Sequence, residues 1–205
     1  MRLIHTSLFV AVAALGLSAC NKQPENAADT VAPATAATPP ADAPPPMTGP
    51  TAEAGATAVA ELAPTQGNET KGSVSFKLVD GRVHVTGQVS GLKPGSEHGF
   101  HIHEKGDCSA PDGASAGGHF NPGTQDHGSV ASDPHHGGDM PNITANAEGV
   151  ATIDAPVSTN VNIGKGDGFD IIGRGLIVHA DADDYKTQPT GNAGARLACA
   201  VIKAP

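Results

Sequence analysis

Residues 72–89 read GSVSFKLVDGRVHVTGQV. Apolar and polar side chains alternate on both sides of Asp80-Gly81, and the apolar ones are Val74, Phe76, Leu78, Val83 and Val85. Alternation with a period of two is typical of strands that bury one face. Asp-Gly is a residue pair that tight two-residue turns prefer. The stretch therefore predicts an antiparallel hairpin with one apolar face.

Further strand signals recur outward from this hairpin, with turn residues between them. They cover residues 57–62, 99–103, 143–147, 150–157, 175–179 and 196–202, besides 72–79 and 82–89 in the hairpin itself. No helical period of useful length is present. This spacing predicts an all-β antiparallel sandwich or flattened barrel, most simply of eight strands. Its core is expected to consist of Val, Ile, Leu and Ala, with Phe76, Phe100, Phe120 and Phe169 as the bulky members.

Two connections between the expected strands are unusually long. They are Lys105–Pro141 and Ala180–Ala195. Ordered loops of more than about 12 residues are usually functional. The chemistry of the protein is therefore expected in these two loops.

The N-terminus indicates export. Met1 and Arg2 precede an almost wholly apolar run, residues 8–17, which is shorter than the roughly 20 residues of a membrane-spanning helix. The sequence Leu-Ser-Ala-Cys at 17–20 resembles the cleavage box of bacterial lipoproteins. That resemblance implies that residues 1–19 are a signal peptide and that Cys20 carries the lipid. The alternative is an ordinary secretory signal with a chance cysteine.

Cysteine usage agrees with export. If Cys20 carries lipid, Cys108 and Cys199 remain as an even pair. An exported protein meets an oxidising compartment, so a disulfide between them is expected, with two buried free thiols as the alternative.

The residues after the signal peptide indicate a tether followed by one domain. Between residues 21 and 56, 11 alanines and 8 prolines occupy 19 of 36 positions, and large apolar residues are few. Residues 20–56 are therefore predicted to be a lipidated, disordered spacer, and residues 57–205 are enough for one domain. Asn21 is not the aspartate associated with inner-membrane retention. The expected location is the periplasm, on a lipid anchored in a bacterial membrane. The outer membrane is favoured, and exposure at the cell surface is the alternative.

The formal net charge of −9 limits the partners. It argues against nucleic acid and against an anionic bilayer bound through a basic face. Contact with a membrane is expected through the lipid on Cys20 alone. No interface signature decides between a monomer and a homodimer.

Histidines form two groups in the sequence. His101 and His103 lie two apart on an expected strand and so project from one face, although such a pair is more often just a polar strand face. The second group, inside the first long loop, is His119, His127, His135, His136 and Asp139. Three imidazoles and a carboxylate suit tetrahedral zinc, and either His135 or His136 could be the third histidine.

Five segments carry a family resemblance. They are GFHIHEKGDC at 99–108, SAGGHFNP at 115–122, HHGGDMPNITANAEGVA at 135–151, LIVHADADD at 176–184 and TGNAGARLAC at 190–199. In this order they resemble the Cu,Zn superoxide dismutases, over nearly everything from Thr57 onward. The resemblance implies a Greek-key sandwich, copper and zinc as cofactors, and dismutation of superoxide to dioxygen and hydrogen peroxide.

The same resemblance implies a role for each site residue. Copper would be held by His101, His103, His119 and His179, and zinc by His119, His127, His136 and Asp139. The shared residue, His119, is expected to be catalytic as well. Asp183 is expected to accept hydrogen bonds from one histidine of each site, and Arg196 to guide superoxide to copper. His98 matches a histidine that supports the structure of the family, and His84 and His135 match no ligand, so all three are expected to be non-ligands.

Two other functions are compatible with parts of the sequence. One is a non-catalytic copper- and zinc-binding protein that buffers or delivers metal, but such a protein has no use for Arg196 as a substrate guide. The other is a lipid-anchored interaction domain with residual histidines, which predicts an incomplete set of ligands. The sequence favours the enzyme, because every expected ligand and Arg196 are present.

Overall fold

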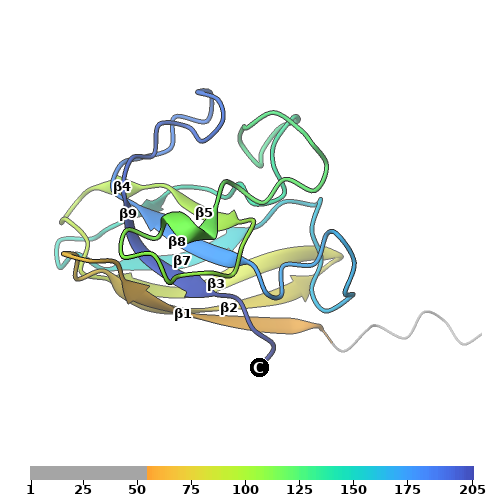
Figure 1. Ribbon diagram of the computed structural model, residues 1–205, viewed down its shortest axis with the longest axis horizontal. Coiled ribbons are helices and arrows are strands. Elements are labelled where there is room, and N and C mark those ends of the chain that lie inside the picture. Colours follow the sequence, from red (N-terminus) through yellow and green to blue (C-terminus); the bar gives the residue numbers. More distant parts are fainter. Residues whose placement is uncertain (1–54) are drawn as a thin grey trace, which may run out of the picture. The chain divides into compact units, whose positions relative to one another are not determined.

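The structure is a computed structural model that describes residues 55–205 (Figure 1). The predicted signal peptide, Cys20 and nearly all of the predicted tether lie outside the described residues. The described part contains one 3₁₀ turn, η1 (Ala114–Ala116), and nine strands: β1 (Thr57–Pro64), β2 (Lys71–Val79), β3 (Arg82–Ser90), β4 (Glu97–His98), β5 (Phe100–His103), β6 (Ile143–Thr144), β7 (Ala151–Pro156), β8 (Gly175–His179) and β9 (Arg196–Val201). Among these residues, no helix has the length and apolarity needed to cross a membrane.

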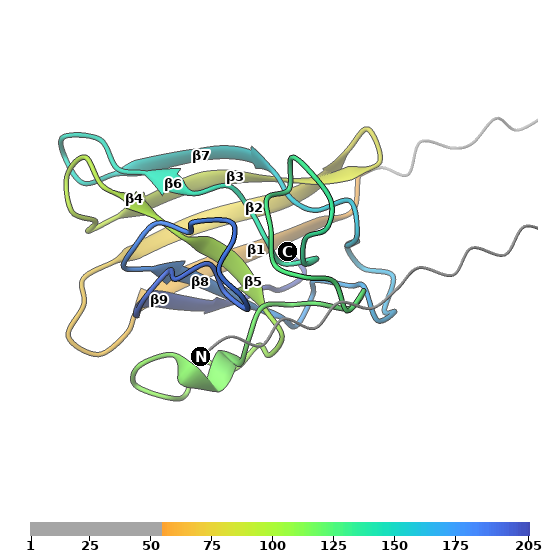
Figure 2. The same ribbon diagram turned by 90° about the horizontal axis from the view of Figure 1, so that it is seen from above.

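Seven strands form one curled antiparallel sheet, in the order β5-β8-β9-β1-β2-β3-β7 (Figures 1 and 2). β1 connects its two halves, because residues 57–62 pair with β2 whereas Ala63 and Pro64 pair with β9. β4 and β6 form a separate two-stranded ribbon. The all-β antiparallel fold predicted from the sequence is confirmed.

All eight predicted strands are present, and the ninth results from a bend at Gly99. β4 pairs with β6, whereas β5, one residue later, pairs with β8. A side chain at Gly99 would lie 2.8 Å from the Ala193 side chain and 3.0 Å from the ring of His101, so only glycine fits the bend. β6 is also shorter than predicted, because it pairs only with the two residues of β4.

The hairpin that the sequence predicts forms between β2 and β3. Val79 pairs with Arg82, and the two turn residues both have positive φ, 49° at Asp80 and 79° at Gly81. That geometry is the one that Asp-Gly favours in two-residue hairpins. Val74, Phe76, Val83 and Val85 are all buried, as the alternation predicts.

The core lies inside the curl of the sheet, where the buried apolar residues form one large cluster. Phe76, Phe100 and Phe120 are buried, but the prediction for Phe169 is wrong, since it is 42% exposed. Phe169 lies in the loop before β8, and the neighbouring Asp170 carboxylate accepts hydrogen bonds from Gly164 and Gly166. These bonds fix the loop while the Phe169 side chain stays outside the core.

The expected disulfide is present. It joins Cys108, in the loop after β5, to Cys199 on β9, with the two Cα atoms 5.8 Å apart. Closing a loop of 91 residues stabilises a fold by about 4 to 5 kcal/mol in the chain-entropy model. The disulfide thus fixes the first long loop against the half of the sheet that carries the site.

Candidate metal centre

The metal centre begins on the outer face of β5 and β8. Both strands are buried on both faces. Phe100 and Ile102 point into the core, so His101 and His103 point outward, and on β8 the same alternation places His179 outward. The two long loops cover this face and account for its burial. The sequence pattern His-x-His therefore places two imidazoles under a cover of loop residues.

The first long loop runs alongside β5 and adds more ligands. His119 forms an isolated bridge with His103, and Phe120 N–H donates to Ile102 C=O at 2.8 Å. On the same strand, Ile102 N–H donates to Gly138 C=O at 2.9 Å. A side chain at Gly138 would collide with the Ile102 carbonyl oxygen. Glycine at this position lets Asp139 approach His119.

A β-bulge positions Arg196. The register between β8 and β9 shifts after Val178, so that His179 pairs with Arg196 and Leu197 is the extra residue. The Arg196 guanidinium then donates to the carbonyl oxygens of Gly113 and Gly117, at 2.6 Å each. Gly117 C=O also accepts a bond from His103 Nδ1 at 2.9 Å. Arg196 is therefore connected to a histidine of the centre through one shared carbonyl.

Two groups of four buried residues each bring their candidate ligand atoms within 4.8 Å of one another. The first is His101, His103, His119 and His179, and the second is His119, His127, His136 and Asp139. These are the two sets that the family resemblance implies, and they share His119. The structure thus brings together every expected ligand from three parts of the chain, which are β5, the first long loop and β8.

In the first group, hydrogen bonds fix which ring nitrogen is free. His101 Nε2 donates to Asp183 Oδ2 at 2.8 Å, His103 Nδ1 to Gly117 C=O, and His179 Nδ1 to Gly194 C=O at 3.2 Å. The opposite nitrogens, His101 Nδ1, His103 Nε2 and His179 Nε2, remain for a ligand. His101 Nδ1 and His119 Nε2 are buried with no hydrogen-bond partner, which is costly unless a cation binds there.

The protonation states of this group suit a metal. Burial lowers the pKa of His119 to about 4 and that of His179 to about 3. Burial, followed by the neighbouring His119 and His179, also lowers the pKa of His103 well below its usual value. These imidazoles are therefore neutral at pH 7 and offer lone pairs. A set of four nitrogen donors suits copper in either of its common oxidation states.

The second group surrounds one carboxylate oxygen. The Nδ1 atoms of His119, His127 and His136 lie 2.8, 3.0 and 3.3 Å from Asp139 Oδ1. Ligands at about 2.0 to 2.1 Å on a tetrahedral zinc ion are about 3.3 Å apart, so the His136 distance matches such a site and the other two are shorter. The other oxygen, Oδ2, accepts backbone N–H bonds from Gly128 and His136. Oδ1 is therefore the oxygen left for a metal ion.

The carboxylate of the second group is ionised. Burial raises the pKa of Asp139, but hydrogen bonds from the three histidines outweigh burial and hold that pKa well below its usual range. For His127, burial lowers the pKa, while hydrogen bonds to Asp139 and Asp183 raise it to about 9. Zinc binding at neutral pH must therefore release a proton from this group.

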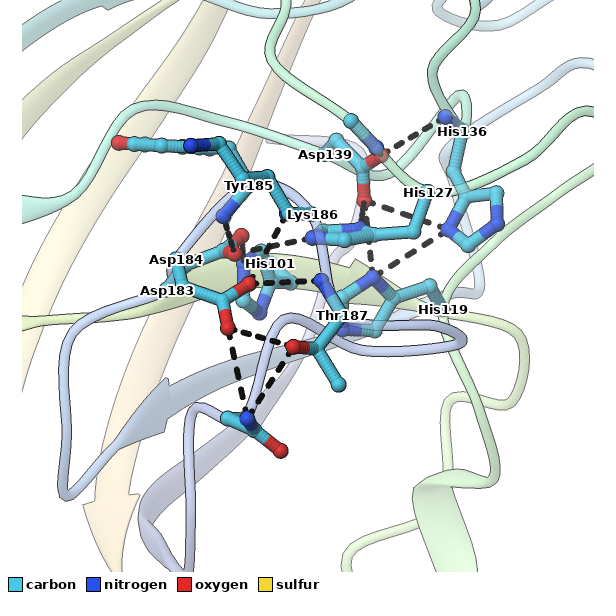
Figure 3. Close-up of polar contacts among 12 residues, drawn as sticks. His101, His119, His127, His136, Asp139, Asp183, Asp184, Tyr185, Lys186 and Thr187 are labelled. Carbon is cyan, nitrogen blue, oxygen red and sulfur yellow. Dashed lines mark hydrogen bonds and ion pairs between the residues drawn. The ribbon is translucent and has the colours of Figure 1, made fainter.

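Asp183 connects the two groups (Figure 3). Its Oδ2 accepts the bond from His101 Nε2, and its Oδ1 accepts one from His127 Nε2 at 2.9 Å. Backbone N–H of Tyr185 donates to the same Oδ1 at 2.7 Å. One buried carboxylate thus orients a histidine of each group, in the arrangement expected for Asp183.

The three histidines expected to be non-ligands lie outside both groups. His98 Nδ1 donates to His179 C=O at 2.8 Å, and His84 lies beside Asp154 on the sheet surface. His135, which the sequence left open as an alternative to His136, donates from Nδ1 to Ser132 C=O. Its Nε2 lies 3.0 Å from Ser158 Oγ, so both ring nitrogens are already occupied.

Some residues of the centre could not be identified from the sequence pattern. The carbonyl groups of Gly117 and Gly194 each orient a histidine of the first group. Gln188 makes two bonds to the backbone of His127. Backbone acceptors do not depend on side-chain type, so only the crowding of glycines in SAGGHF and TGNAGAR could have pointed to Gly117 and Gly194. No pattern in the sequence points to Gln188.

A curled antiparallel sheet that carries two buried ligand groups with one shared imidazole defines a two-metal protein. The family described as copper/zinc superoxide dismutase (SODC) matches residues 70–202. The chain belongs to this family.

Similarity to individual proteins agrees with membership of this family. The chain is 39% identical over 149 residues to superoxide dismutase (Cu-Zn) 2 of Aquifex aeolicus, covering 71% of this chain and 86% of the relative. It is 48% identical over 122 residues to the superoxide dismutase (Cu-Zn) of Caulobacter vibrioides, covering 57% and 68%. A crystal structure of a double mutant of a SOD-like protein from Bacillus subtilis matches with a TM-score of 0.61 and 37% identity, over 71% of this chain and 97% of that one.

Removing a ligand of the second group should empty that site first. In His127→Ala and Asp139→Ala, the affinity for zinc is expected to fall by more than about tenfold, because a closed four-ligand site loses one ligand. Copper content should change less than zinc content. The variants should lose more of their thermal stability than of their turnover. Metal analysis and thermal melting check this. Zinc that stayed at one per chain in both variants would show that the second group is not the zinc site.

Proposed function

We propose that this chain dismutates superoxide, converting two superoxide ions and two protons into dioxygen and hydrogen peroxide. The chain is an oxidoreductase of the copper/zinc family, and copper and zinc are its metals. The observation that carries the proposal is the pair of buried ligand groups sharing His119, with Arg196 connected to the first group through Gly117. His101, His103, His119 and His179 would hold copper, and the second group would hold zinc.

Copper, when bound, supplies a one-electron redox couple, and zinc supplies a fixed positive charge. The chain's own residues handle the proton. His119 is held at Nδ1 beside Asp139, while its Nε2 is buried and has no hydrogen-bond partner. Nε2 is therefore the atom that can take up a proton and give it to the superoxide ion that becomes peroxide. Asp139 holds the His119 ring in position while the proton is transferred.

Arg196 attracts and orients the anion. A chain with a formal net charge of −9 repels superoxide overall, so attraction must be local. The Arg196 guanidinium is half-buried beside the first group and stays charged at pH 7. Its two bonds to Gly113 and Gly117 fix its plane. A protein that only buffers metal has no need of such a fixed cation, which argues for the enzyme over the metal carrier.

One chain contains the complete centre. All ligands, Asp183 and Arg196 belong to the same described domain, so a monomer and a homodimer are both compatible with the activity. The experiment that tests the activity is pulse radiolysis of the protein loaded with both metals, beside the metal-free protein.

We further propose that the protein lies in the periplasm and that a lipid on Cys20 anchors it in the outer membrane. The support comes from the sequence: the apolar run at residues 8–17, the Leu-Ser-Ala-Cys box and the tether rich in Ala and Pro. In this arrangement the spacer would hold the dismutase domain away from the bilayer surface.

Cys20→Ala tests the anchor. The variant should retain full dismutase activity but lose its association with membranes, because the lipid and not the polypeptide provides the attachment. Fractionation of cells followed by an activity assay of each fraction measures both. An alanine variant that still sediments with membranes would contradict the lipid anchor.

A further inference from the structure

Gln188 joins the two long loops at His127. Its Oε1 accepts a hydrogen bond from His127 N–H at 2.8 Å, and its Nε2 donates to His127 C=O at 2.9 Å. Both backbone groups of one residue are thus bound by a single side-chain amide. The amide takes the place of a neighbouring β-strand, although the two residues are 61 positions apart.

His127 has no other backbone support. Within residues 55–205, no backbone group pairs with its N–H or C=O, and it lies outside every strand and helix. Its ring, by contrast, is held at both ends, by Asp139 at Nδ1 and by Asp183 at Nε2. The position of the ring therefore depends on where the surrounding loop places the main chain of His127.

A second side-chain amide, that of Asn142, connects the loops in the reverse direction, from the end of the first loop to the backbone of the second. Asn142, which follows the first long loop, binds the backbone of Asp183 in the second, accepting from its N–H at 2.9 Å and donating to its C=O at 3.0 Å. The bond between His127 and Asp183 is thus fixed from both loops. Gln188 is exposed, and nothing in the sequence distinguishes it from an ordinary polar surface residue.

We propose that Gln188 is a positioning residue for the zinc site, which holds the main chain of His127 so that its ring meets Asp139 and Asp183 together. This inference rests on the proposed assignment of the second ligand group to zinc. Gln188 touches neither metal nor substrate. Its effect is on how long zinc stays bound and on the geometry of the site.

Two variants and one control test the proposal on the full chain loaded with both metals. Gln188→Ala removes both bonds. Gln188→Glu keeps the size and one acceptor but sets an oxygen against His127 C=O. Gln125→Ala is the matched control, because Gln125 lies in the same loop as His127 but its side chain bonds only to the nearby Gly123 C=O. The readouts are the rate of zinc transfer to a chromophoric chelator and the visible spectrum of Co²⁺ placed in the zinc site.

Both Gln188 variants should release zinc about tenfold faster than the wild type, as is typical when a residue supporting a metal ligand is lost. Their Co²⁺ spectra should change, while Gln125→Ala matches the wild type. Zinc release within about twofold of the wild type, or an unchanged Co²⁺ spectrum with a lower melting temperature of the metal-free protein, would overturn the proposal. Neither readout uses superoxide, so a failure of the dismutase assignment would leave this test intact.

Discussion

In Arg196→Glu, kcat/KM for superoxide is expected to fall by about 100-fold, within the range that electrostatic steering contributes to association. Arg196 is the cation fixed beside the first ligand group, and glutamate would place an anion there. Arg196→Lys should lose much less, roughly severalfold, because it keeps the charge but cannot donate to both Gly113 and Gly117 as the planar guanidinium does. Pulse radiolysis on proteins with verified metal content measures all three rates.

Ionic strength supplies the control for Arg196. Salt screens attraction between charges, so the wild-type rate should fall as salt rises. The glutamate variant should fall less, or gain, because screening weakens its repulsion of superoxide. Equal rates for the three proteins at low salt would exclude the steering role and favour the metal-buffering alternative.

Asp183→Asn is expected to lower zinc affinity by about 10- to 100-fold, the usual effect of losing a group that orients a metal ligand. The carboxylate accepts bonds from His101 and from His127. Asparagine has the same size but presents one oxygen and one NH₂ group, so one of the two histidine N–H groups would face another donor. Both ligand groups lose alignment in this variant, whereas the loss of Asp139 acts mainly on the zinc group.

Asp184→Asn is the matched control for Asp183. Asp184 is the adjacent carboxylate, but it is exposed and binds only within its own loop, to Thr187, Lys186 and Asn192 among others. Competition for zinc against a chelator of known affinity measures both variants. If Asp183→Asn held zinc as tightly as Asp184→Asn, the bridging role of Asp183 would be wrong.

The fold could be predicted from local patterns. Alternation around Asp80-Gly81 specifies the hairpin, and the same period of two places His101 and His103 on one face. Phe169 was predicted in the core because it is large and apolar. The loop fixed by Asp170 overrides that preference, and no local pattern in the sequence reports the bonds from Gly164 and Gly166.

The ligand sets were implied by family segments, and the structure brings the same residues together. What the sequence could not supply is the support around them. The bulge at Leu197 that aims Arg196, the shared Gly117 carbonyl and the Gln188 amide all depend on contacts between distant parts of the chain. Such contacts depend on backbone position and strand register, which cannot be predicted from the residue types of a single sequence.

We conclude that two metals sharing one histidine make this chain a superoxide dismutase. The check is the metal content of the purified protein, measured on the same sample as superoxide turnover by pulse radiolysis. We expect one copper and one zinc per chain, and a second-order rate constant that approaches about 10⁹ M⁻¹s⁻¹. A sample with both metals fully bound that removes superoxide no faster than the metal-free protein would contradict it.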